Sequence, residues 1–174
     1  MNEMSKEIIF SRAVIQKRVQ EMADQISSDY AGSDLVIIGI LKGAFIFMAD
    51  LIRMMNIPCK VDFVRVASYG AGAESFGKVV MTKDIETSIR GRDILIVEDI
   101  VETGLTLQYL AGWLKERNPR SLKVCAFLDK RKRRKVSFEA DYVGSTIDDG
   151  FVVGYGLDFN EQYRFLPEVY VIKQ

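Results

Sequence analysis

Short, almost uninterrupted apolar runs are the feature of this sequence that most limits its possible folds. Residues 34–40 form the run DLVIIGI, and residues 92–99 form the run RDILIVED. Continuous apolar character over so short a length is typical of a strand that is buried on both faces of a sheet. A further run, SLKVCAFLD at 121–129, indicates another strand. We therefore expect a central sheet with other elements packed against both of its faces.

Helical periodicity separates these runs. Apolar residues recur at helical spacing over 12–29, 44–55 and 105–117, which predicts three helices. Strands that alternate with helices over 34–129 indicate an α/β fold with a mainly parallel sheet. Further strands are expected at 59–68, 78–83, 141–147, 151–156 and 168–173. No repeat or linker divides the 174 residues, so we expect a single domain over 1–174.

The composition excludes several classes of function. Twenty-four basic residues balance 24 acidic ones, so no overall field attracts nucleic acid or an anionic membrane. Histidine is absent, which excludes catalytic triads that use histidine and metal sites that use histidine ligands. Cys59 and Cys125 lie in apolar stretches and are expected to be buried thiols, as suits a reducing compartment. The segment MNEMSKEIIF lacks the apolar core of a signal peptide, and we expect a cytoplasmic protein.

The segment LIVEDIVETGLTL at 95–107 carries the strongest chemical signal. A buried strand ends in Glu98 and Asp99, and a helix then begins at Thr-Gly-x-Thr. The first turn of a helix has unpaired N–H groups that favour a phosphate. Carboxylates beside a phosphate need ribose hydroxyls or Mg²⁺ as partners. A sugar phosphate with a metal-bound diphosphate satisfies every group, whereas the alternative is that both acids only solvate the end of the strand.

These residues also carry a resemblance. VEDIVETGLT resembles the phosphoribosyl-diphosphate motif of type I phosphoribosyltransferases. The segments LKGAFIF, ASYG, LDK and FVVGYGLDFNEQYRFL appear in the order found in the hypoxanthine-guanine branch of that family, over about residues 10–174. The resemblance implies the type I phosphoribosyltransferase fold, a mainly parallel twisted sheet flanked by helices. It also implies a core at about 30–145 and a small hood formed by the N-terminal segment and about 146–174.

The resemblance implies an activity and its partners. Such enzymes transfer the 5-phosphoribosyl group from phosphoribosyl diphosphate to N9 of hypoxanthine or guanine, giving IMP or GMP and diphosphate. Their cofactor is Mg²⁺. Since helix 44–55 is apolar on most sides, we also expect a homo-oligomer, either a dimer or a tetramer.

Site residues follow from the resemblance position by position. The residues expected to bind ribose and the 5′-phosphate are Glu98, Asp99, Glu102, Thr103, Gly104, Leu105 and Thr106. Those expected at the diphosphate are Leu41, Lys42, Gly43, Ser68, Tyr69 and Arg164, with a cis peptide between Leu41 and Lys42. The purine site would comprise Lys130, Phe151, Val152 and Asp158. The expected Mg²⁺ ligands are Glu98, Asp99 and Asp158.

Three of these residues have distinct expected tasks. Lys130 would donate to the purine 6-oxo group, Phe151 would stack on the ring, and the backbone of Val152 would read the 2-position. The loop 69–80 would close over the reaction. Without the resemblance, Lys42 would be interpreted as an exposed turn lysine, Arg164 as part of a surface ion pair and Phe151 as a core aromatic. Most of the basic run 130–135 is interpreted as a solvated face.

One position departs from the pattern. The family usually carries aspartate where this chain has Glu102, and the resemblance assigns that residue as the base near purine N7. A shift of ~1 Å in such a group can cost ~100-fold in rate. We expect activity with Glu102 as the base. The alternative is a catalytically weakened regulator that senses nucleotides and binds RNA through residues 130–135.

Overall fold

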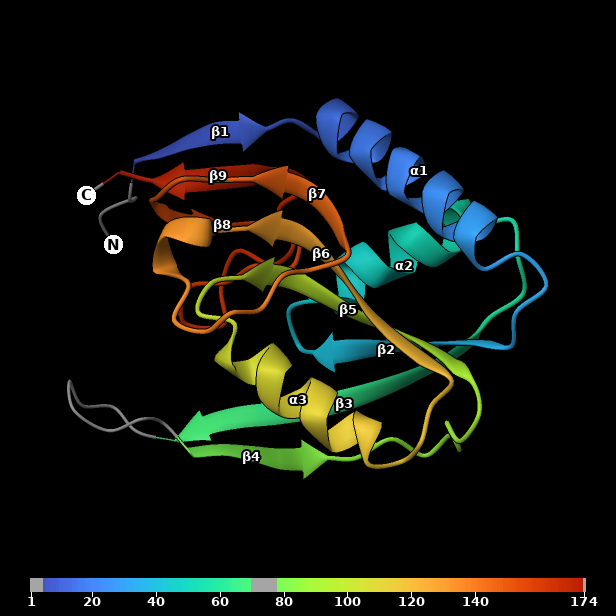
Figure 1. Cartoon of the computed structure of the whole chain (residues 1–174). Coiled ribbons are helices and arrows are strands. Elements are labelled where there is room, and N and C mark those ends of the chain that lie inside the picture. The colour runs from blue at the N-terminus through green and yellow to red at the C-terminus, as the bar shows by residue number, and fades with distance from the viewer. Residues whose placement is uncertain (1–4, 70–77, 174) are drawn as a thin grey trace.

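The computed structural model describes residues 5–69 and 78–173 (Figure 1). Along the chain its elements are β1 (Lys6–Phe10), α1 (Arg12–Asp29), β2 (Leu35–Leu41), α2 (Phe45–Met54), β3 (Lys60–Tyr69), β4 (Lys78–Lys83), β5 (Asp93–Val101), α3 (Leu105–Lys115), β6 (Ser121–Asp129), the 3₁₀ turn η1 (Arg131–Arg133), β7 (Tyr142–Thr146), β8 (Phe151–Val153) and β9 (Val169–Ile172). The three helices lie within two residues of their predicted bounds.

A six-stranded sheet forms the centre of the molecule, with the strand order β4-β3-β2-β5-β6-β7. All of its neighbouring pairs are parallel except β3 and β4, which are antiparallel. Parallel neighbours need long crossover connections, and α2 and α3 provide two of them. The predicted α/β fold with a mainly parallel sheet is therefore confirmed.

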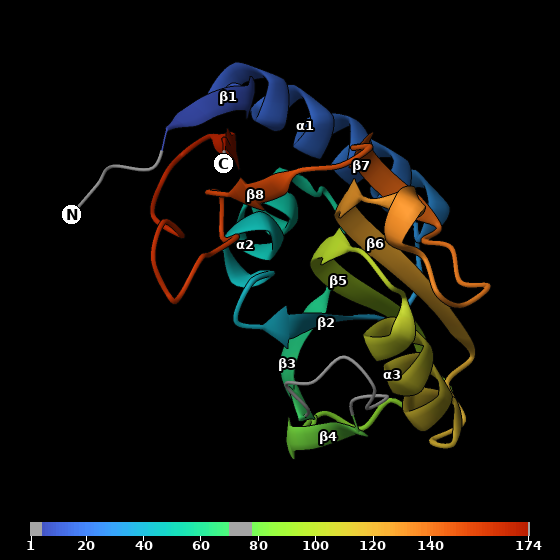
Figure 2. The same cartoon turned by 90° about the vertical axis from the view of Figure 1, so that its left-hand side faces the viewer.

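Helices cover both faces of this sheet (Figures 1 and 2). Successive residues of a strand face opposite sides. Accordingly, Leu35 and Ile37 of β2 pack in the core with α1 and α2, whereas Val36 and Ile38 pack in the core with α3. This arrangement explains why the run 34–40 is apolar at nearly every position.

A second, three-stranded antiparallel sheet has the order β1-β9-β8. Strand β1 was not predicted from the sequence, because its residues are mostly exposed and show no alternation. The strand predicted at 151–156 is shorter than expected, since β8 ends at Val153. The cause is local, because Gly154, Tyr155 and Gly156 all have positive φ (93°, 52° and 97°), outside the β region that a regular strand occupies.

An aromatic cluster joins that second sheet to the central one. The Phe127 ring of β6 lies 5.4 Å from the Phe47 ring and 5.0 Å from the Tyr155 ring, between centroids. The Tyr155 hydroxyl donates to Asp50 Oδ2 at 2.9 Å. Residues of α2, of β6 and of the turn after β8 are thus packed in one core.

Two further expectations concern the cysteines and the membrane. Cys125 is buried and Cys59 is partly buried, both are free thiols, and burial raises the pKa of each. The predicted buried thiol is confirmed for Cys125, whereas Cys59 is only partly buried. Among the described residues, no helix combines the length and the apolar character that crossing a membrane requires.

Phe127 provides a test of this packing. Its side chain is 1% exposed, so Phe127→Ala should leave a cavity and lower the free energy of unfolding by ~3–5 kcal/mol. Urea denaturation measures this change. Phe159→Ala, at a position that is 36% exposed, is the matched control and should cost less than ~1 kcal/mol. Equal losses in the two variants would contradict the packing of Phe127 in the core.

Candidate active site

The carboxyl ends of the parallel strands bring the predicted site residues together. β2 pairs with β5, and β5 pairs with β6, so the segments after these strands leave the sheet at the same edge. Ligands of open α/β sheets bind at this edge. The segments are 41–43, 98–106 and 129–130, and each contains residues that were assigned to the site from the sequence.

The segment after β2 packs tightly against two others. The peptide between Leu41 and Lys42 is cis, as expected. A Cβ on Gly43 would lie 1.9 Å from Asp99 Oδ2, and one on Gly156 would lie 2.4 Å from the Gly43 carbonyl oxygen. Neither position can accept a side chain without movement of its neighbours. Gly43 is therefore enclosed between the carboxylate of Asp99 and the turn after β8.

Glu98 and Asp99 form a crowded carboxyl pair at the end of β5. Glu98 Oε1 accepts from the Asp99 N–H at 3.1 Å, and Asp99 Oδ1 accepts from the Ile100 N–H at 2.8 Å. Burial, together with the charge of Asp99, raises the pKa of Glu98 well above its ordinary value. Burial also raises the pKa of Asp99, although the positive charge of Arg164 acts in the opposite direction. A cation beside this pair would relieve the repulsion between the two acids.

The turn into α3 lies where the sequence predicts the phosphate to bind. Gly104 is the N-cap residue with φ of 80°, and Thr103 Oγ1 accepts from the Leu105 N–H at 3.4 Å. The first N–H groups of the helix have no intrahelical acceptor. A pocket at this turn is lined by Glu98, Ile100, Val101, Glu102, Thr103, Gly104, Thr106 and Leu107. The structure thus joins the acid at position 98 and the helix start in one pocket.

Lys130 and Glu102 form a direct ion pair. The Lys130 ammonium donates to Glu102 Oε1 at 2.9 Å and to the Gly150 carbonyl at 2.6 Å. The Lys130 side chain is 1% exposed, against 37% for Glu102. A buried ammonium requires such partners because desolvation is otherwise costly. Separate tasks were expected for these two residues from the sequence, and their pairing was not predicted.

Phe151 follows Gly150, the residue whose carbonyl accepts from Lys130. Its side chain is 44% exposed, so the alternative of a core aromatic is wrong. The ring contacts Phe159 edge to face, with 5.3 Å between centroids. Val152 is buried and pairs with Val171 in the second sheet. The Lys130 ammonium is bound to the carbonyl of Gly150, and the exposed Phe151 is the next residue in the chain.

A carboxylate lies between the two cations that were assigned to the diphosphate. Glu161 Oε2 is 2.7 Å from Lys42 Nζ, and Glu161 Oε1 is 3.7 Å from Arg164 Nη2. The bond with Lys42 lowers the pKa of Glu161. Arg164 also contacts Asp158 Oδ1 at 2.7 Å and donates to the Gly156 carbonyl at 2.6 Å. Glu161 was not predicted from the sequence, because an acid in FNEQYRF has no distinctive spacing.

The predicted contacts of Ser68 and Tyr69 stay predictions. Both residues end β3, where their backbones pair with Val79 and Lys78. Their side chains and residues 70–77 lie outside the described part of the chain, and the expected closing loop falls mostly in that segment.

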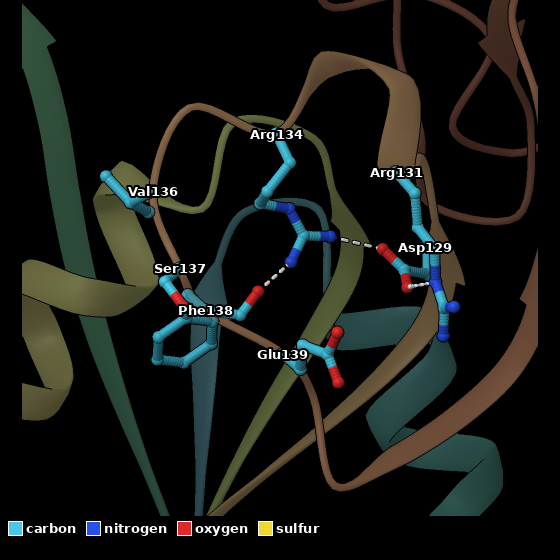
Figure 3. Close-up of a pocket in the computed structure, with 7 residues that line it drawn as sticks. All are labelled: Asp129, Arg131, Arg134, Val136, Ser137, Phe138 and Glu139. Atoms are coloured by element: carbon cyan, nitrogen blue, oxygen red, sulfur yellow. Dashed lines mark hydrogen bonds and ion pairs between the residues drawn. The ribbon is translucent and has the colours of Figure 1, made fainter.

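Several side chains of the basic run 130–135 form ion pairs with acids of the same chain. Arg131 and Arg134 both pair with Asp129, as Figure 3 shows. Lys132 lies 3.7 Å from Asp148 and Arg133 lies 3.9 Å from Glu102. Most of the run is exposed, as predicted, but Arg134 is only 16% exposed. These internal partners weaken the alternative in which the run binds RNA.

Comparison with known proteins agrees with this geometry. Residues 6–160 match the family model of the phosphoribosyl transferase domain. The chain is 47% identical to the hypoxanthine-guanine phosphoribosyltransferase of Aquifex aeolicus, covering 91% of this chain and 90% of that one. It is 45% identical to the Bacillus subtilis enzyme of the same name, covering 97% and 93%.

A solved structure shows the same likeness in three dimensions. The hypoxanthine phosphoribosyltransferase of Staphylococcus aureus superposes with a TM-score of 0.94 at 45% identity, covering 99% of this chain and 93% of that one. The central parallel sheet with helices on both faces is therefore the type I phosphoribosyltransferase fold. Sequence, fold and site geometry agree that this chain belongs to the phosphoribosyltransferase family, among the hypoxanthine-guanine phosphoribosyltransferases.

Proposed function

We propose that this protein is a purine salvage enzyme that transfers the 5-phosphoribosyl group from phosphoribosyl diphosphate to N9 of hypoxanthine or guanine. The products are IMP or GMP and diphosphate. The observation that carries the proposal is the buried Lys130 ammonium, which pairs with Glu102 and donates to the carbonyl of Gly150, the residue before exposed Phe151. A donor, a carboxylate and an aromatic face are the groups that a 6-oxopurine requires.

The ribose and its 5′-phosphate would occupy the pocket at the start of α3. Backbone N–H groups and the hydroxyls of Thr103 and Thr106 suit the phosphate, because the helix dipole also favours an anion there. Glu98 and Asp99 would accept hydrogen bonds from the ribose hydroxyls. The ribose would therefore separate the carboxylates of Glu98 and Asp99 from the phosphate.

The carboxyl pair also fits Mg²⁺. Burial and mutual repulsion raise the pKa of Glu98, and oxygen ligands are those that Mg²⁺ prefers. We propose that Glu98, Asp99 and Asp158 hold the ion together with substrate oxygens and water. When bound, Mg²⁺ would neutralise charge that develops on the departing diphosphate. Asp158 would have to exchange its present contacts with Arg164 and the Glu161 N–H.

Lys42 and Arg164 would bind the diphosphate. Both cations currently share the Glu161 carboxylate, and the guanidinium fork of Arg164 suits phosphate oxygens. The incoming diphosphate would take over these contacts. As the bond from C1′ to the diphosphate breaks, the two cations stabilise the leaving group.

Lys130 and Glu102 would recognise the base and receive its proton. Lys130 would donate to the 6-oxo group, whereas the 6-amino group of adenine presents a second donor. Leaving such a buried group unpaired costs ~1–3 kcal/mol, so adenine is rejected. Glu102 would take the proton that the purine loses as N9 bonds to C1′. The backbone of Val152 would read the 2-position and Phe151 would stack on the ring.

The layout of the chain supports three further proposals. We propose that residues 1–174 form one domain, with a core at about 30–145 and a hood that includes the β1-β9-β8 sheet. Reduced Cys125 and Cys59 are consistent with the cytoplasmic location that we propose. Exposed Phe45 and Phe165 support assembly into a dimer or tetramer.

The activity can be tested by absorbance with phosphoribosyl diphosphate, Mg²⁺ and one purine at a time. Hypoxanthine and guanine should yield nucleotide, whereas adenine should react at least ~10-fold more slowly because Lys130 faces a donor. Chelation of Mg²⁺ provides the control and should abolish product formation. Equal rates with adenine and hypoxanthine would contradict the role of Lys130, and an absence of turnover with every base would contradict the proposed function.

Glu102→Gln tests the base. Glutamine retains the size and can still accept from Lys130, but it cannot take a proton, so kcat should fall by ~10²–10⁴-fold. Glu102→Asp should stay active, because it restores the side chain that the family usually has. Glu116→Gln, at the exposed C-cap of α3, is the matched control and should leave steady-state kinetics unchanged. An unaltered kcat in Glu102→Gln would show that another group takes the proton.

The oligomer can be tested by light scattering coupled to size exclusion. We expect a mass that is two or four times the 19.7 kDa of one chain. Phe165→Ser should shift the mass toward one chain, since Phe165 is 81% exposed. A wild-type protein that elutes as a single chain at micromolar concentration would refute the proposed assembly.

A further inference from the structure

The turn before α3, which is the proposed phosphate site, is hydrogen-bonded to the segment after β6. Three consecutive carbonyl oxygens of the turn each accept one hydrogen bond from that segment. The bonds run from Lys130 N to Val101 O at 2.9 Å, from Arg134 Nε to Glu102 O at 3.1 Å and from Lys135 N to Thr103 O at 3.0 Å. The outer two donors are backbone groups that any residue except proline supplies. The middle donor is a side chain, so this bond depends on the identity of residue 134.

The direction of these carbonyls determines the direction of the N–H groups. A trans peptide is planar and points its C=O and N–H to opposite sides. The N–H groups of Glu102, Thr103 and Gly104 therefore face away from the segment 130–135. None of the three donates to another group in the described part of the chain. The pocket at this turn is lined by Glu102, Thr103 and Gly104, and by no residue of 130–138.

Arg134 is itself held firmly. Beyond Glu102, its guanidinium donates through Nη1 to the Phe138 carbonyl and through Nη2 to Asp129 Oδ1, as Figure 3 shows. Its stem packs on the turn, since a Cβ on Gly104 would lie 3.1 Å from Arg134 Cδ. A planar fork can serve three acceptors in fixed directions, which a lysine ammonium on a flexible stem cannot do.

We propose that Arg134 is a positioning residue that orients the peptide between Glu102 and Thr103, so that its N–H is presented to the 5′-phosphate. The proposal rests on the proposed function, because it concerns the same nucleotide site. It assigns Arg134 to the phosphate half of the site. The expected defect of a variant is therefore confined to ligands that carry the phosphate.

The test compares GMP with guanosine, which lacks the phosphate, by calorimetric titration of the full chain. Arg134→Ala should weaken GMP binding about tenfold or more, the effect of losing one charge-assisted hydrogen bond, and leave guanosine binding unchanged. Arg134→Lys retains the charge and most of the stem, and it should show the same selective loss. In steady-state assays the KM for phosphoribosyl diphosphate should rise while the KM for hypoxanthine is maintained.

Arg131→Ala is the matched control. Arg131 also pairs with Asp129, at 2.9 Å, but it is 64% exposed and does not contact Glu102, so this variant should bind GMP as the wild type does. If Arg131→Ala matched Arg134→Ala while Arg134→Lys bound normally, the effect would be one of charge and the proposal would be wrong.

Four other outcomes are informative. Equal losses for GMP and guanosine would indicate a general structural defect and overturn the proposal, as would unaltered GMP binding in Arg134→Ala. If Arg134→Ala fails to fold, Arg134→Lys decides the question alone. A wild-type protein that binds neither ligand would refute the proposed function, and the role of Arg134 would fall with it.

Discussion

The parallel pairing of β2 with β5 and of β5 with β6 is the constraint on which the rest of the structure depends. It sends three chain segments out of one edge of the sheet, and those segments carry Lys42, the acids at 98 and 99, and Lys130. The apolar cores on both faces then hold the strands in register. A change of one residue in register would turn every apolar side chain to the opposite face. The positions of the polar groups are thus fixed by the burial of the apolar ones.

The cations of the site are already paired with acids of the same chain. Lys130 pairs with Glu102, Lys42 with Glu161, and Arg164 with Asp158. A lone charge in a partly buried site would need water or would carry a large desolvation cost. Under the proposed function, an incoming anion would replace a carboxylate at Lys42 and Arg164, so substrate binding would exchange ionic partners. The charges are held in place before the ligand arrives, which is the condition for electrostatic catalysis.

Much of the fold followed from local patterns in the sequence. Strands β2 and β5 were predictable because their residues are apolar at almost every position, and α3 because Thr103 and Gly104 precede a helical repeat. Strand β1 was not, because its exposed residues pair with β9, more than 150 positions away. The early end of β8 depends on positive φ at Gly154 and Tyr155, and the tyrosine provides no signal for it.

The motifs of the sequence predicted which residues belong to the candidate site, but not which of them contact one another. The motifs named Lys130 and Glu102, yet their pairing depends on how two strand ends approach in space. Glu161 contacts Lys42 across 119 positions of sequence, a distance over which no pattern extends. Arg134 stands in a run of consecutive basic residues, and composition cannot distinguish it from Arg133. Only burial and the three acceptors around its guanidinium set it apart.

The enclosure of Gly43 has a consequence for how such a chain can evolve. The space that a Cβ at position 43 would need is filled by the Asp99 carboxylate, and Gly156 in turn touches the Gly43 carbonyl. Residues in direct contact are those whose substitutions do not combine additively. Positions 43, 99 and 156 should therefore show strong epistasis, in which a side chain gained at one glycine is tolerated only after a compensating change at another. Substitutions at these three positions, which are far apart in the sequence, should therefore be accepted together and not independently.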